Sequence, residues 1–329
     1  MHPTSPTPKT IVLTALAMIA FATNALLCRM ALGEGMIDAA SFTLIRLGSG
    51  ALVLLPLVVL ARRVTTTARP DWIAPVAMSV YMICFSFAYL ALGAGTGALI
   101  LAGSIQMTML IAGLRSGERL RPAGWIGLGL AATGLVLLVA PGASAPPLGS
   151  ALSMTTAGIA WGVYSLRGRG NTDPLRATAT SFVLALPLAA LAGLPFLGDV
   201  HLSVTGVGLA LVSGAVASAL GYVIWYHALP GLTATTAATV QLSISVLAAT
   251  GGAFLFAEAV TARLIGSSAA VLGGLALVFR QQGAARSPAP IHLGREPAPR
   301  QGPNGERASP RRLPTRPSST PPLRPEPIG

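Results

Sequence analysis

The feature that most constrains this chain is an internal repeat with an offset of 140 positions. Both copies lie in apolar surroundings, and no single match is long. The residues that recur at this offset are Ser41-Phe42 and Ser181-Phe182, Glu118 and Glu258, and the runs 134–137 and 274–277. Because several matches share one register, the sequence predicts two copies of one structural unit.

The composition indicates that this unit lies in a membrane. Hydrophobic residues make up 53% of the chain and charged residues only 10%, with a mean hydropathy of +0.68, whereas about a quarter of an ordinary soluble domain is charged. Crossing the hydrocarbon core takes about 20 helical residues. The ten apolar runs predicted to cross are 10–31, 40–61, 72–92, 96–115, 123–140, 149–167, 177–197, 205–229, 233–256 and 263–280.

Helices rather than strands are expected in these runs. Segments such as Leu135–Val139 are apolar on every face, whereas a spanning strand alternates polar and apolar residues. Gly and Ala, which let helices approach closely in lipid, are abundant. The predicted fold class is therefore an all-α membrane protein with ten transmembrane helices.

The positions of the arginines predict the orientation. If the N-terminus is cytoplasmic, nearly all loop arginines face the cytoplasm and the outer loops are acidic, as the positive-inside rule requires. The inner-loop residues are Arg62, Arg63, Arg69, Arg115, Arg119, Arg121, Arg167, Arg169 and Arg176. Both termini are then cytoplasmic. Since each unit has an odd number of spans, the second unit is inverted relative to the first, as in alternating-access transporters.

The predicted organisation has four parts. Residues 1–9 form a cytoplasmic N-terminus, residues 10–140 and 149–280 form the two five-helix repeats, and residues 281–329 form a cytoplasmic tail. The segment from Lys9 also resembles a signal peptide, but its cleavage would remove the partner of the sixth run. The tail, rich in Pro and Arg, is predicted to be disordered, and it either binds anionic lipid headgroups or is simply solvated.

In this order and spacing, motifs along residues 10–280 resemble the EamA family of the drug/metabolite transporter superfamily. The segments that carry the resemblance are Phe21–Asn24, Arg29, Arg46, Gly117–Leu120, Gly127–Gly134, Trp161–Tyr164, Trp225–Leu229, Phe256–Glu258 and Gly266–Gly274. The resemblance implies a carrier of the bacterial inner membrane that exports small metabolites such as amino acids or related compounds. The second repeat has Leu186 where the first has Arg46, so the cavity is not electrostatically symmetric.

Polar side chains deep in the predicted spans are the first candidates for a substrate cavity. Asn24, Gln106, Gln241 and Ser245 lie well inside their runs, where polar groups are costly and face either a cavity or a partner helix. Both readings stay open for each of them.

Aromatic residues are the second group of candidates. Tyr81, Phe85 and Tyr89 recur on one face of the third run, and Tyr222 and Trp225 lie in the corresponding run of the other repeat. Trp161 and Tyr164 match Phe21 and Asn24 by the repeat offset. Such stripes serve either packing or an aromatic-walled pocket for a small amphipathic solute.

The charged candidates divide into one substrate-binding residue and two ion pairs. Arg46 is predicted about 8 Å below the membrane surface, where its guanidinium could hold a substrate carboxylate by a bidentate contact. Arg29 is expected to reach Glu34 or Asp38. Glu118 is expected to pair with a neighbouring arginine such as Arg121, and Glu258 with Arg263, as structural or gating ion pairs.

No catalytic, metal-binding or nucleotide-binding pattern emerges from the sequence. We therefore expect neither an enzyme nor a resident cofactor, metal or nucleic-acid partner. The predicted function is a secondary transporter that moves a small organic metabolite outward by alternating access. The alternatives are a flippase of a lipid-linked or amphipathic molecule and a non-transporting membrane scaffold. The oligomeric state and the coupling ion stay open.

Overall fold

The computed structural model describes residues 7–61, 71–115, 122–142, 145–168, 173–228, 231–232 and 240–285, the last seven of these by their backbone only. Most of these residues are helical, and no strand occurs in the described ranges apart from one isolated bridge between Ile37 and Leu202. The predicted tail lies almost wholly outside the described residues, as do Glu118 and Arg121.

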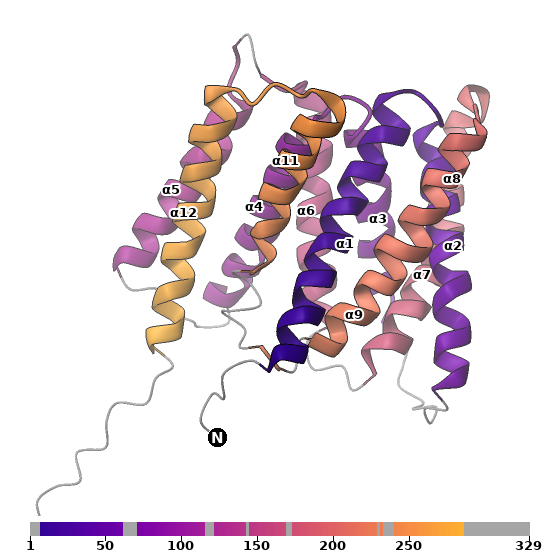
Figure 1. Ribbon diagram of the computed structural model, residues 1–329, viewed down its shortest axis with the longest axis horizontal. Coiled ribbons are helices and arrows are strands. Elements are labelled where there is room, and N and C mark those ends of the chain that lie inside the picture. Colours follow the sequence, from indigo (N-terminus) through magenta and orange to yellow (C-terminus); the bar gives the residue numbers. More distant parts are fainter. Residues whose placement is uncertain are drawn as a thin grey trace, which may run out of the picture. The chain divides into compact units, whose positions relative to one another are not determined.

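The first repeat folds into five helices close to the predicted bounds (Figure 1). They are α1 (Pro8–Gly33), α2 (Ala39–Leu60), α3 (Ile73–Ala88), α4 (Ala94–Arg115) and α5 (Pro122–Val139). Polar caps fix the starts of the first two. The Thr7 hydroxyl accepts a hydrogen bond from the Thr10 amide, and Asp38 accepts one from the Ser41 amide, which satisfies donors that a helix start leaves free.

The second repeat is less regular. Its elements are α6 (Leu148–Gly168), α7 (Pro174–Gly193), η1 (Leu194–Asp199), α8 (Val204–Val212), η2 (Ser213–Leu220), α9 (Gly221–Ala228), α11 (Ser243–Phe256) and α12 (Ala262–Ala285). The predicted run 205–229 is one continuous rod in which η2, a π-helical segment, joins α8 to α9. In η2 the backbone departs from regular α-helical geometry. Because π-helical turns are rare and are found mostly at functional sites, η2 is a candidate functional position.

Among the described residues, six helical segments are long and apolar enough to cross a membrane on their own: α1, α2, α4, α5, the segment Pro174–Asp199 and the segment Val204–Ala228. Helices α3 and α11 and the first part of α12 are apolar but shorter. Multiple membrane crossings are thus established by length and composition, while the full count of ten stays a prediction.

Packing between the repeats has a two-fold pattern. Three pairs of repeat-related helices contact each other: α2 with α7, α4 with α11, and α5 with α12, the last pair lying side by side in Figure 1. The other main contacts also occur in matching pairs, one in each arrangement of the repeats. The packing of α3 on α6 corresponds to that of α9 on α1, and the packing of α4 on α6 corresponds to that of α11 on α1. The sequence repeat is therefore also a repeat of contacts.

The repeat-related helices run antiparallel. On α5, Gly127 lies against Gly274 of α12. Gly134, which lies further along α5, is against Ser267 of α12. Contact partners that descend in number as the other helix ascends indicate opposite directions, and Gly95 with Ala249 and Ala98 with Ser245 show the same for α4 and α11. This is the arrangement that an inverted repeat produces.

Candidate functional site

A cavity of about 510 Å³ lies between helices of both repeats. Residues of α1, α3, α4, α6, η2, α9 and α11 line it, and most of its wall is aromatic or aliphatic. Its aromatic lining residues are Phe21, Tyr81, Phe85, Tyr89, Trp161, Tyr164, Tyr222, Trp225 and Tyr226. A concave, mostly apolar site with a few polar groups is what small-molecule binding requires.

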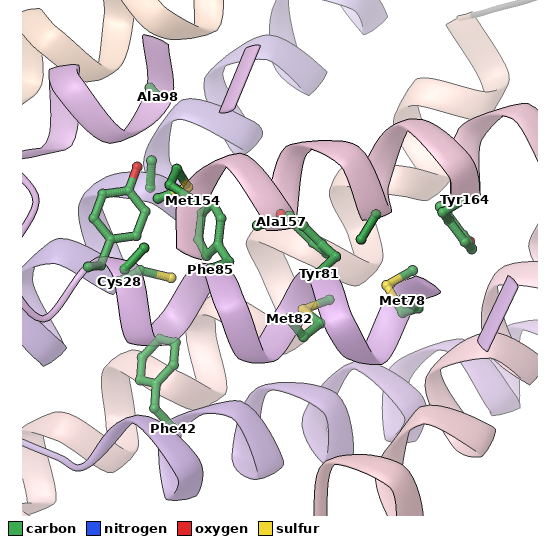
Figure 2. Packing of buried hydrophobic residues seen from close by; sticks show 14 of the residues in the cluster. Cys28, Phe42, Met78, Tyr81, Met82, Phe85, Ala98, Met154, Ala157 and Tyr164 are labelled. Atoms are coloured by element: carbon green, nitrogen blue, oxygen red, sulfur yellow. The ribbon is translucent and has the colours of Figure 1, made fainter. Parts of the chain in front are cut away.

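The two aromatic stripes meet at one tryptophan. Trp161 of α6 lies 4.7 Å from Tyr81 of α3 and is stacked on Tyr222 of α9 at 5.3 Å between ring centroids. Figure 2 shows Tyr81 and Phe85 in the space between α3 and α6, beside Ala157 and Met154. Each stripe thus contributes to one shared wall rather than packing separately within its own repeat.

All but two of the predicted cavity residues line this cavity. Those that do are Asn24, Tyr81, Phe85, Tyr89, Gln106, Trp161, Tyr164, Tyr222, Trp225 and Gln241. Their role in binding a solute stays a prediction. Ser245 does not line the cavity, because its hydroxyl donates to the Ala98 carbonyl of α4 at 3.1 Å. For Ser245 the interhelical alternative was the right one.

Arg46 lies behind the cavity wall, and the expectation that it holds a substrate carboxylate directly was wrong for this conformation. Its side chain is 0% exposed and is absent from the lining. The guanidinium carbon lies over the rings of Phe85 and Tyr81, 5.1 and 5.7 Å from their centroids. The rings that line the cavity on one side therefore shield this cation on the other, through cation–π contacts.

Segment η2 supplies one polar contact of the Arg46 side chain. The guanidinium Nε donates to the Ser218 hydroxyl at 3.2 Å, and Ser218 lines the cavity. Gly214 allows α2 to approach η2 closely. A Cβ at this position would overlap the Arg46 carbonyl oxygen and the Ser49 hydroxyl. Sequence reasoning missed Ser218, whose only signal is a serine five residues after Ser213 in an apolar run.

A second polar path leads from Arg46 to the cavity through α1. The guanidinium Nη1 lies 4.0 Å from the Cys28 sulfur, Cys28 lies 3.7 Å from the Ser213 hydroxyl, and Ser213 donates to the Asn24 amide oxygen at 2.7 Å. Cys28 is fully buried. Asn24 again lines the cavity.

At one end of the bundle, Glu258 joins three helices. Its carboxylate accepts hydrogen bonds from Arg29 Nε of α1 at 2.9 Å and from the Ala94 amide, the first of α4, at 2.8 and 3.1 Å. Both charged side chains are 20% exposed. A carboxylate at a helix start is favoured by the helix dipole, which offsets its unfavourable place after the end of α11.

Backbone geometry brings Glu258 to this position. Ala257 has a left-handed conformation with φ of 50°, so the chain turns sharply after α11. A Cβ on Gly93 or Gly252 would lie 2.8 or 2.6 Å from the carboxylate, and only glycine leaves this space free.

The partners predicted for these charges were therefore wrong. Glu258 pairs with Arg29, not with Arg263, whose guanidinium donates to the Ala140 and Pro141 carbonyls between α5 and α6. Arg29 likewise pairs with Glu258 instead of Glu34 or Asp38. The approach of α4, whose Ala94 amide donates to the Glu258 carboxylate, decides the pairing.

The cavity extends from Tyr89, near the Glu258 end, to Gly168 and Pro174 at the opposite end. There Asp71 and Arg167 link the start of α3 to the end of α6, with two hydrogen bonds of 2.9 Å each. The guanidinium holds the pKa of the Asp71 carboxyl below its usual value, so the pair weakens when acid protonates Asp71. It is exposed, and salt therefore screens it.

The residues that the structure describes contain no cluster of His, Cys, Asp or Glu that could hold a metal. The site therefore consists of an aromatic cavity, a buried cation behind its wall, and an ion pair beyond each end.

Comparisons with known proteins agree with this architecture. The model of the EamA-like transporter family matches residues 8–140 and again 148–280. An uncharacterised protein of Pseudomonas aeruginosa is 54% identical over 274 residues, which cover 83% of this chain and 96% of that protein. An uncharacterised transporter of Archaeoglobus fulgidus is 26% identical over 70% of this chain and 83% of its own length.

A solved crystal structure has the same fold. It superposes with a TM-score of 0.58 at 18% identity, covering 84% of this chain and 98% of the other.

Proposed function

The chain belongs to the EamA-like transporter family, and from this premise we propose that it is a secondary carrier that moves a small organic metabolite by alternating access through the aromatic cavity. The observation that carries the proposal is the position of the cavity. Both repeats contribute to its wall, so a change in their relative tilt would expose it at one end and close it at the other.

The described conformation fits one half of such a cycle. The Arg29–Glu258 pair and the start of α4 hold α1, α4 and α11 together at one end, while the lining continues to Gly168 and Pro174 at the other. We propose that the first end is the closed gate and that the second is the open one.

The arginine distribution assigns the sides in this proposal. Residues 62–70, 116–121 and 169–172 carry most of the loop arginines, which the positive-inside rule puts in the cytoplasm. The open end is then cytoplasmic, both termini lie in the cytoplasm of a bacterial inner membrane, and the chain crosses ten times. Export of an amino acid or a related compound begins from this inward-facing state.

The topology can be tested by labelling single cysteines in intact cells. With Cys84 replaced by Ala, Thr65→Cys should react with a membrane-impermeant thiol reagent only after the cells are opened, and Ser144→Cys should react from outside. Cys28 is fully buried and can stay in place, because the reagent should not modify it. Labelling of both positions from the same side would contradict the ten-span topology.

Transport itself can be tested with purified protein in proteoliposomes. Thermal-shift screening against amino acids, nucleosides and aromatic acids selects a solute, and its labelled form should then show counterflow that depends on the carrier. Trp161→Ala, which removes the ring shared by both aromatic stripes, should reduce counterflow by about tenfold or more, since buried aromatic residues contribute several kcal/mol.

Matched truncation of lipid-facing Trp125, which is exposed on α5, should leave counterflow unchanged. An equal loss in both variants would contradict the assignment of the cavity. Transfer of a fluorescent lipid between leaflets, without solute counterflow, would favour the flippase alternative instead.

A further inference from the structure

Arg46 carries a buried charge that no acidic residue in the described part of the chain compensates. Its side chain is fully buried against the Ser218 and Tyr81 hydroxyls, the Cys28 thiol and two rings, and its Nη2 has no hydrogen-bond partner among the residues described. Within the described ranges no carboxylate contacts it. Because an arginine side chain stays protonated in proteins, the charge persists and acts through the cavity wall.

The hydrogen bonds around Arg46 all point toward the cavity. A guanidinium can only donate, so Ser218 accepts from Nε and keeps its own proton for another acceptor. Along the second path Ser213 donates to Asn24, and Cys28 is therefore the donor to Ser213. This path ends at the Asn24 amide group, whose N–H donors remain.

The polar lining is consequently rich in donors. Ser218 and Asn24 offer donors that the cation polarises, and the buried Tyr89 hydroxyl has no hydrogen-bond partner among the residues that the structure describes. None of the described residues that line this cavity is Asp, Glu, Lys or Arg. We infer that the cavity binds the anionic group of an organic solute at the Ser218–Asn24 wall, and that Arg46, acting through this wall, determines the preference for anions.

The inference states which class of ligand the cavity of the proposed carrier binds. It rests on the proposed function only in taking this cavity as the binding site. The Ser218 hydroxyl lies 3.2 Å from the Arg46 Nε, so the centre of an anionic group that accepts a hydrogen bond from this hydroxyl would lie within about 9 Å of the guanidinium carbon. At an effective dielectric constant of about 20, the attraction corresponds to a gain in affinity on the order of tenfold, with an equal penalty for a cation.

Three probes of similar shape test the preference: phenylacetate, phenylacetamide and 2-phenylethylammonium, which are negative, neutral and positive at neutral pH. Trp161 and Trp225 in the cavity report binding by fluorescence once the exposed Trp72 and Trp125 are replaced by Phe. Phenylacetate should bind about tenfold more tightly than the amide, and the ammonium probe most weakly. Equal affinities, the reverse order, or no binding of any probe would overturn the inference.

Variants identify the residue responsible. Arg46→Gln should bring the affinities of phenylacetate and phenylacetamide within about twofold of each other, and Ser218→Ala should lower their ratio severalfold by removing one charge-assisted donor. Ser79→Ala is the matched control and should keep the ratio, because this buried serine donates to the Ala185 carbonyl. Misfolding weakens all probes alike, so the ratio reports charge selection rather than structure; an unchanged ratio in both test variants contradicts the inference.

The carrier proposal and the anion inference fail separately. Probes that bind in the expected order but show no counterflow would refute transport and leave the anion preference standing. Counterflow that is equal for the three probes would support the carrier and refute the role of Arg46.

Discussion

Glu258→Gln is expected to open the closed end of the cavity. The substitution keeps the shape of the side chain but removes the charge that Arg29 and the Ala94 amide share. Because charge-assisted hydrogen bonds contribute about 1.5–3 kcal/mol each, the open population should rise by about tenfold or more. The measurement is the rate at which a membrane-impermeant thiol reagent, added outside, labels Ala25→Cys in the cavity wall in a Cys84→Ala background.

Two controls make the result specific to the ion pair. Arg29→Gln should raise the labelling rate to a similar extent, whereas Arg263→Gln, at an arginine that bonds backbone carbonyls, should not. Equal rates in all three variants and the parent would show that the pair supports folding rather than gating. Glu118, which lies outside the described residues, is still predicted to act on the opposite gate, so Glu118→Gln should lower the rate.

Alanine at two glycines of one helical rod should change stability in opposite directions. A Cβ at Gly214 in η2 would overlap the backbone of Arg46 and the Ser49 hydroxyl, whereas a Cβ at Gly208 in α8 has nothing within 4 Å. Since backbone atoms cannot move aside cheaply, Gly214→Ala should destabilise the protein by about 3 kcal/mol. Gly208→Ala should be neutral or stabilise it by up to about 1 kcal/mol.

Thermal unfolding in detergent, followed by fluorescence, measures both changes. The displacement of α2 from η2 should also move Arg46 away from Ser218, so Gly214→Ala should weaken the binding of phenylacetate more than that of phenylacetamide. Equal unfolding temperatures for the two variants would contradict the close packing of α2 on η2.

Much of the fold could be predicted because lipid restricts the choices. A chain that must satisfy its backbone in hydrocarbon forms helices, so apolar runs between arginine-rich loops mark helices directly. The predicted run 40–61 corresponds to Ala39–Leu60, and 149–167 corresponds to Leu148–Gly168. The π-helical segment could not be predicted, because Ser213–Leu220 reads as an ordinary part of an apolar run.

The candidate site was only partly predictable. The aromatic stripes could be found from their four-residue spacing, since side chains at this spacing share a helix face. The direction in which a polar side chain points could not be predicted, because lipid-facing and buried faces are equally apolar in a membrane helix. Ser245 faces α4, and Arg46 faces the back of the aromatic wall. Both orientations depend on how each helix is rotated about its axis, which the sequence pattern does not show.

The sequence by itself determined that this protein is a repeated, all-helical membrane protein of the EamA type, because hydropathy and a fixed offset of 140 positions are properties of the chain alone. Only the tertiary structure decided which charges meet. Arg29 and Glu258 are separated by 229 positions, and their pairing depends on α4 beginning where the chain turns after α11. Ion pairs and cavity walls depend on distances between helices, and those distances are set by the close glycine contacts that pack one repeat against the other.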